Sequence, residues 1–202
     1  MKTFSDSEVR THLLRLKEKA IVLGASDAKI IPVDLIPIEE EIVEMCRPPG
    51  CEDYGRSANC PPYVMTPKEA REWIRRFRMA LLFKIDISPE VLISEEGLRV
   101  FKKVFIISSK LEAMSVEQGY TFSKSLSAGF CKGVFCKDVP CEALADGGEC
   151  RYPSLARPPL EAIGINVFRL AKDVGWEIHA ILRDSDPKDI PSAMLAGLLL
   201  VA

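Results

Sequence analysis

The sequence predicts an α/β fold, with α+β as the variant left open, in one domain built from an internal duplication. The composition is that of a globular protein, since 48% of the 202 residues are hydrophobic and 28% are charged. Helix-like and strand-like segments alternate along the chain. A third observation is a set of cysteines repeated 90 residues later, namely Cys46, Cys51 and Cys60 followed by Cys136, Cys141 and Cys150.

The first predicted elements are a helix and an edge strand. A helix is expected from Ser5 or Ser7 to about Leu23, because serine is a good N-cap and apolar residues recur at spacings of three and four. Residues 28–33 are expected to form a strand. Pro32 and Pro37 suggest a sheet edge or a strand end, because proline cannot donate to a ladder.

A second helix and strand follow the first cysteine segment, residues 46–63. Thr66 and Pro67 are typical of a helix start, so a helix is expected to about Phe77. Residues 79–86 are expected to form a strand that is buried on both faces, because five apolar residues follow one another there.

The same order of elements is expected in the second half, around a second cysteine segment at residues 129–153. The predicted elements are a helix at 95–117, a strand at 120–126, a helix at 158–174, a strand at 176–182 and a final buried strand in the apolar tail. The halves, about residues 1–90 and 91–202, are therefore expected to be related by a pseudo-twofold axis within a single domain.

Charge and hydropathy exclude several classes of protein. The net charge of −2 gives no reason to expect nucleic acid or an anionic membrane as a partner. The charged N-terminal segment lacks a signal-peptide core, and the apolar tail at 193–202 is too short to span a bilayer. We therefore expect a cytoplasmic protein without a membrane segment.

Seven cysteines in such a chain predict metal binding. An odd number of cysteines in a reducing compartment argues against a disulfide framework. Cys131 joins Cys136, Cys141 and Cys150, which completes a set of four thiols within 20 residues. Four thiolates can hold zinc or a [4Fe–4S] cluster, and the wide C-x4-C spacing favours the cluster while leaving zinc as the alternative.

The first cysteine segment has only three cysteines, and Glu41 stands at the position equivalent to Cys131. Carboxylates are disfavoured at soft-metal sites, so Glu41 is the weaker candidate for a fourth ligand. Two arrangements remain open. Each segment can hold its own cluster, the first with an open iron or a non-cysteine ligand, or the two segments can share cysteines across the pseudo-axis.

Arginines beside the cysteines are candidates for contacts with a cofactor. Arg151 and Arg157 can neutralise a negatively charged cluster or bind an anion. The alternative is an ordinary surface role, such as an ion pair between Arg157 and Glu161. His12 and His179 are expected to be packed or exposed residues rather than ligands.

The residues around the third cysteine of each segment resemble a known family. The sequence reads CPPY at 60–63 and CRYP at 150–153, and the latter is followed by ARPPLEA at 156–162 and GINV at 164–167. These motifs are similar to those of the predicted metal-binding proteins called domain of unknown function 2284, common in anaerobic bacteria and archaea. The resemblance implies cysteine-bound metal, with iron–sulfur as the expected form, and it implies no particular reaction.

Three functions are consistent with these residues. The first is an iron–sulfur protein with a redox role, as an electron carrier, an oxidoreductase or a component of one, acting with a redox partner protein. The second is a zinc-stabilised structural or binding module without redox chemistry. The third is a metal-sensing or metal-delivery protein that uses the three-cysteine segment as a labile site.

Overall fold

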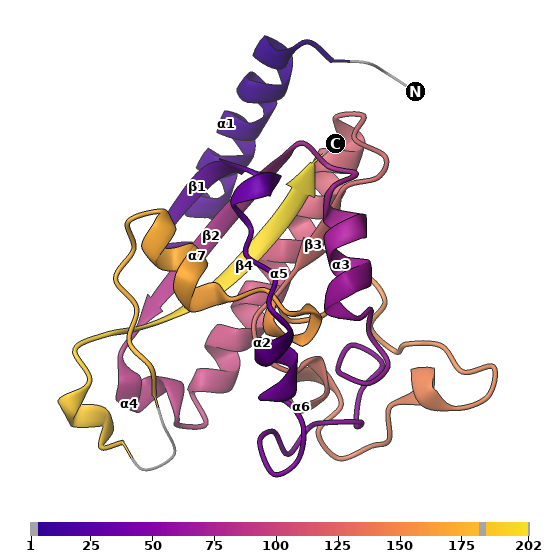
Figure 1. The fold of residues 1–202 in the computed structure, drawn as a ribbon, viewed down its shortest axis with the longest axis vertical. Helices are drawn as coiled ribbons and strands as arrows, with labels where there is room; N and C mark the ends of the chain where they lie inside the picture. The colour runs from indigo at the N-terminus through magenta and orange to yellow at the C-terminus, as the bar shows by residue number, and fades with distance from the viewer. Residues whose placement is uncertain (1–3, 182–184, 202) are drawn as a thin grey trace.

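The computed structural model describes residues 4–181 and 185–201 (Figure 1). The elements run in the order α1 (Asp6–Val22), β1 (Asp27–Pro32), α2 (Glu40–Glu44), α3 (Pro67–Ile74), β2 (Met79–Ile87), α4 (Pro89–Leu92), α5 (Gly97–Glu117), β3 (Lys124–Leu126), α6 (Cys131–Phe135), α7 (Val167–Asp173) and β4 (Ala193–Val201). Short 3-10 helices lie at Val33–Leu35, Glu142–Leu144, Glu161–Ile163 and Pro187–Asp189.

Four antiparallel strands form one sheet in the order β1-β2-β4-β3. The long strands β2 and β4 lie in the centre and are buried on both faces. Helices α1 and α5 cover one face, where Leu13 and Ile107 pack with Phe83 of β2. Helices α3 and α7 pack on the other face (Figure 1). The α/β class is confirmed, and the antiparallel sheet makes it the α+β variant.

Several elements begin and end where the sequence predicts. Ser5 caps α1 in a capping box with Glu8, and Thr66 caps α3 in the same way with Glu69. Strand β1 is at the sheet edge. No helix in the described part of the chain is both long and apolar enough to cross a membrane.

Two predicted strands are wrong in whole or in part, for one physical reason. Only Lys124–Leu126 of the strand expected at 120–126 forms, and residues 176–181 form none, while residue 182 lies outside the described residues. Tyr120 and Trp176 each follow a positive-φ glycine and donate their backbone N–H five residues back, to Ser115 and Ala171. This is the Schellman motif, in which the apolar residue packs to close a helix.

The helix expected at 158–174 is shorter than predicted and begins at Val167, with Asn166 as its N-cap. The preceding residues instead bond to distant backbone. Leu160 donates to the carbonyl of Ser127, and Glu39 donates to the carbonyl of Gly164. These long-range bonds satisfy backbone groups that a local helix would otherwise have satisfied.

The predicted duplication stays a prediction. Each half of the chain runs helix, strand, cysteine segment, helix, strand, as α1-β1-α3-β2 and α5-β3-α7-β4. A twofold axis between β2 and β4 would exchange β1 with β3 and β2 with β4, and the strand order would stay the same. The element positions do not keep the 90-residue offset, since β2 begins at Met79 and β4 at Ala193.

Candidate metal centre

The two cysteine segments contact each other near α2 and α6 (Figure 1). The hydroxyl of Ser57 lies 3.2 Å from the sulfur of Cys131, and the side-chain amide of Asn59 donates to that sulfur at 3.4 Å. Ser57 and Asn59 belong to the first segment and Cys131 to the second. Thiols far apart in the sequence are therefore gathered in one region, and all seven are free.

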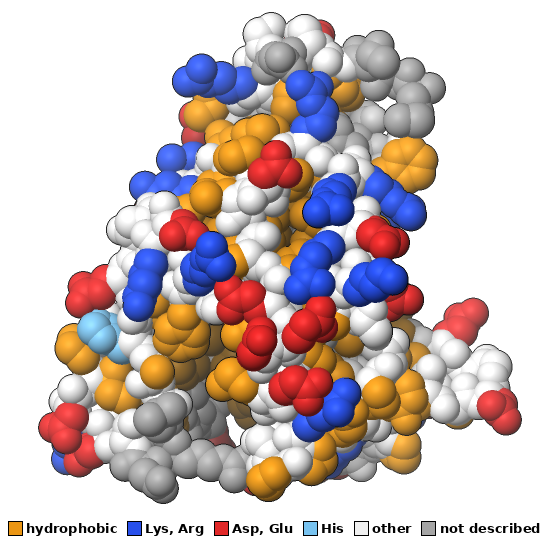
Figure 2. Space-filling model, in the orientation of Figure 1, with side chains coloured by type: hydrophobic (Ala, Val, Ile, Leu, Met, Phe, Trp, Pro, Cys, Tyr) orange, Lys and Arg blue, Asp and Glu red, His pale blue; other side chains and the backbone are white. Residues whose placement is uncertain are grey.

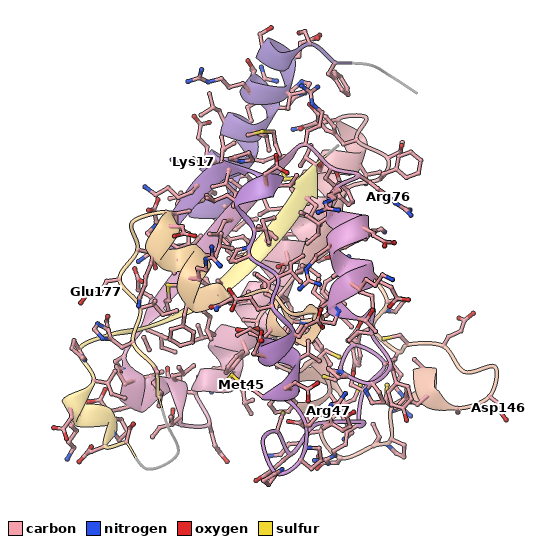
Figure 3. All side chains as sticks on the ribbon, in the orientation of Figure 1. Lys17, Met45, Arg47, Arg76, Asp146 and Glu177 are labelled. Carbon is pink, nitrogen blue, oxygen red and sulfur yellow. The ribbon has the colours of Figure 1, made fainter. Side chains whose placement is uncertain are left out.

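The four cysteines of the second segment line one cavity, which we call the four-cysteine site. Its volume is about 280 Å³, and its thiols come from short local structures. Cys131 is the first residue of α6, Cys136 is the C-cap after that helix, and Cys141 precedes the 3-10 helix at Glu142–Leu144. Asp146 lies at the outer end of the same segment, away from the sheet (Figure 3).

The remaining thiols, Cys46, Cys51 and Cys60, line a second cavity of about 350 Å³, which we call the three-cysteine site. Successive turns place these thiols. The N–H of Cys51 donates to the carbonyl of Cys46, and the N–H of Cys60 donates to the carbonyl of Ser57. Four cysteines therefore line one cavity and three line the other, and Cys60 and Cys131 interact between the two sites.

Burial favours the protonated form of three thiols, those of Cys46, Cys60 and Cys131. Desolvation, with a smaller contribution from neighbouring thiols, raises the pKa of Cys60 to about 12 and that of Cys46 to about 11. Desolvation also raises the pKa of Cys131, against the opposing effect of hydrogen bonds from Ser57 and Asn59. Because the thiolate is the metal ligand, a bound cation would have to displace these protons.

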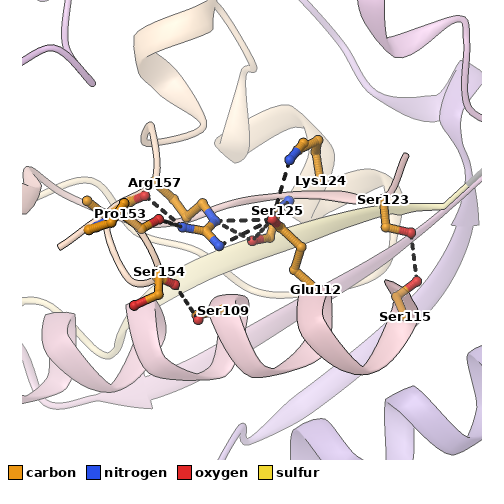
Figure 4. A network of polar contacts seen from close by, with 10 residues as sticks. Ser109, Glu112, Ser115, Ser123, Lys124, Ser125, Pro153, Ser154 and Arg157 are labelled. Carbon is orange, nitrogen blue, oxygen red and sulfur yellow. Dashed lines mark hydrogen bonds and ion pairs between the residues drawn. The ribbon is translucent and has the colours of Figure 1, made fainter. Parts of the chain in front are cut away.

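Arg157, which follows the second cysteine segment, forms hydrogen bonds with side chains of α5 and β3 (Figure 4). Its guanidinium donates to both carboxylate oxygens of Glu112 on α5, at 3.1 and 3.2 Å, and to the carbonyls of Pro153 and Ala156. The carboxylate also accepts the backbone N–H and the hydroxyl of Ser125. The ion-pair partner of Arg157 is therefore Glu112 rather than Glu161.

Arg151 lies closer to the thiols. Its side chain lines the four-cysteine site and forms an ion pair with Glu142, which also lines that cavity. The guanidinium also interacts with Cys136. A cofactor contact by Arg151 stays a prediction, and so does one by Arg157.

A comparison with protein families matches residues 29–201 to a family described as "Predicted metal-binding protein (DUF2284)". The chain belongs to this family. The matched residues include both cysteine segments and the described lining of both cavities. No curated protein and no solved structure matches the chain.

Two acidic residues of this family member line the three-cysteine site and were not predicted as part of it. Asp53 interacts electrostatically with Cys60, and Glu161 with Cys46. Asp53 lies two residues after Cys51, a signal present in the sequence. The position of Glu161 depends on the long-range pairing of residues 159–166. Glu41 is exposed on α2, outside the described lining of both cavities.

The histidines lie apart from the thiols or at the cavity margin. His12 contacts the hydroxyl of Tyr120 at 3.0 Å, and His179 pairs with Glu177 while lining the three-cysteine cavity. Within residues 4–181 and 185–201, no three His, Cys, Asp or Glu side chains lie close enough together to hold a single ion. Thiols are nevertheless the donor type that suits a soft metal or a cluster, and polar groups lie within hydrogen-bond distance of two of the sulfurs, those of Cys131 and Cys150.

Proposed function

We propose that the protein binds an iron–sulfur cluster at each cysteine site and acts in electron transfer with a redox partner protein. Four thiols hold a [4Fe–4S] cluster at the four-cysteine site. Three thiols hold a second cluster that keeps one position open. The observation that supports this proposal best is the division of seven free cysteines between two adjacent cavities, four around one and three around the other.

The size of the four-cysteine cavity favours a cluster over a single zinc ion. Its volume is about 280 Å³, whereas one water molecule takes about 30 Å³ of liquid. A structural zinc ion is enclosed tightly by four thiolates, each about 2.3 Å away. A group that contains several iron and sulfide atoms suits the larger space.

Hydrogen bonds to sulfur also support the proposal. Cys131 accepts from Asn59, and Cys150 accepts from the backbone N–H of Tyr152 at 3.4 Å. Donors to ligand sulfur tune the reduction potential of iron–sulfur clusters, which supply one-electron transfer when bound. Here the chain provides thiolate ligands, sulfur-directed donors and a nearby positive charge on Arg151.

Metal analysis tests the proposal. Protein purified without oxygen is assayed for iron, acid-labile sulfide and zinc, alongside Cys150→Ala, Cys60→Ala and the control Ser94→Ala. We expect about eight iron atoms per chain for two cubane clusters. Each cysteine variant loses the iron of its own site and keeps that of the other, and Ser94→Ala retains both.

Two results would contradict the proposal. A colourless protein that contains zinc but no sulfide would instead support the zinc-stabilised module. Loss of all iron in Cys60→Ala and in Cys150→Ala, with the fold retained, would favour one cluster shared between the segments.

A further inference from the structure

We propose that the three-cysteine cavity is also a binding site for a small, uncharged and mostly apolar organic molecule. The inference rests on the proposed function, because the ligand would lie beside the open position of the cluster held by Cys46, Cys51 and Cys60. It adds a ligand class to a site for which the family implies only metal.

The two cavities differ in what surrounds the thiols. Around the four-cysteine site, the described lining comes from the two cysteine segments and the residues directly after the second, as far as Ala156. The three-cysteine cavity extends beyond its segment. Its lining includes Leu92 of α4, Phe101 of α5, Phe168 of α7 and Ala193 at the start of β4. Thiol ligation alone does not require this additional space.

The additional lining is chiefly apolar and has the size of a ligand pocket. Pockets for small molecules typically have volumes of about 300–1,000 Å³, with apolar walls and a few polar groups, and this cavity has about 350 Å³. It opens to solvent, since Figure 2 shows a hollow between hydrophobic side chains in the lower half of this face.

The charged groups of the cavity determine the ligand class. Asp53 and Glu161 line it together with the thiols, and each interacts with a cysteine. No lysine or arginine occurs in the described lining, and the histidine there, His179, contacts Glu177. A chiefly apolar space disfavours any charged group, and an anion would also face the carboxyl groups of Asp53 and Glu161. The ligand is therefore uncharged, with an apolar body and a polar group directed toward the cysteine end.

A matched pair of small molecules tests the ligand class. The probes are 2-acetylnaphthalene and 2-naphthoate, which share a ring system and differ in charge. Equilibrium dialysis against metal-loaded protein without oxygen gives both affinities. We expect the neutral ketone to bind one molecule per chain and at least tenfold more tightly than the carboxylate.

Substitutions locate the site. Ile178 lines the cavity from a segment without helix or strand, so Ile178→Trp fills space and weakens ketone binding at least tenfold. Phe168→Ala removes part of an exposed lining residue and weakens binding about threefold. The control Val22→Trp, exposed on α1 and outside the lining, leaves the affinity unchanged.

Magnetic resonance places the ligand next to the cluster. We expect the ketone to change the electron paramagnetic resonance signal that disappears in Cys60→Ala, and to leave unchanged the signal that disappears in Cys150→Ala. Equal affinity for the two probes, or wild-type affinity in both cavity variants, would overturn the ligand site. Iron measured on the same samples separates the two proposals. If protein purified without oxygen contains no iron but binds the ketone, the missing iron refutes the cluster and the binding upholds the pocket.

Discussion

The side-chain amide of Asn59 donates a hydrogen bond to the sulfur of Cys131 across the boundary between the two cysteine segments, at 3.4 Å. The hydroxyl of Ser57 contacts the same sulfur at 3.2 Å, and Ser57 is almost completely buried. The first segment therefore supplies polar contacts to a cysteine of the second. A change in one segment should be detected at the cluster proposed for the other.

Removing the amide of Asn59 should lower the reduction potential of the cluster proposed at the four-cysteine site. Hydrogen bonds to sulfur stabilise the more negative, reduced state. Loss of about 1 kcal/mol of this preference corresponds to roughly 40 mV for one electron. Redox titration followed by electron paramagnetic resonance measures the shift in Asn59→Leu. Asn59→Gln retains a donor and should shift the potential less, and an unchanged potential in Asn59→Leu would contradict the argument.

The sequence predicts correctly those elements that are determined by residues close together in the chain. The cap residues Ser5 and Thr66 have their bonding partners three residues away, so both helix starts follow from the sequence. The apolar run of β2 indicates burial on both faces. The cysteine spacing likewise indicates which thiols belong to which segment.

Other features depend on contacts between residues far apart in the chain. Tyr120 has the alternation expected of a strand residue, but it follows the local turn at Gly119 that closes α5, and its ring packs against His12 and Phe4 from the start of the chain. Glu161 reaches the three-cysteine site because its neighbours bond to residues near 39 and 127. No local pattern specifies such pairings, since the partners are more than 30 residues away.

Neutralising Glu112 should destabilise the protein. Its carboxylate holds Arg157, with which it forms an ion pair whose side chains are only 12% and 13% exposed. Removing one partner of a buried pair leaves the other uncompensated, so Glu112→Gln should reduce the free energy of unfolding by about 3 kcal/mol. Chemical denaturation measures the loss. Glu40→Gln, in the exposed pair with Arg71, should cost less than about 1 kcal/mol.

The contribution of Glu112 to the free energy of unfolding should also depend on pH. Burial acts to raise the pKa of Glu112, but hydrogen bonds from Ser125 and the charge of Arg157 outweigh it and hold the pKa below the ordinary value of 4.5. Because the pKa of Glu112 is lower in the folded state than in the unfolded chain, its carboxylate stabilises the fold at pH values above about 4.5. This stabilisation disappears as the pH falls through the folded-state pKa. The difference between wild type and Glu112→Gln should therefore shrink in acid, and a constant difference from pH 7 to 3 would contradict this assignment.

Strands β2 and β4 pack closely at Gly197, where a larger residue should not fit. Gly197 pairs directly with Phe83, and a Cβ added to Gly197 would lie 2.6 Å from ring atom Cε1 of that buried phenylalanine. Gly197→Ala should reduce the free energy of unfolding by about 2 kcal/mol, because the ring is enclosed by the core and cannot move aside freely. In a Phe83→Leu background the same substitution should cost less than about 1 kcal/mol, since the smaller side chain leaves room. Equal costs in both backgrounds, measured by chemical denaturation, would show that the ring does not cause the restriction.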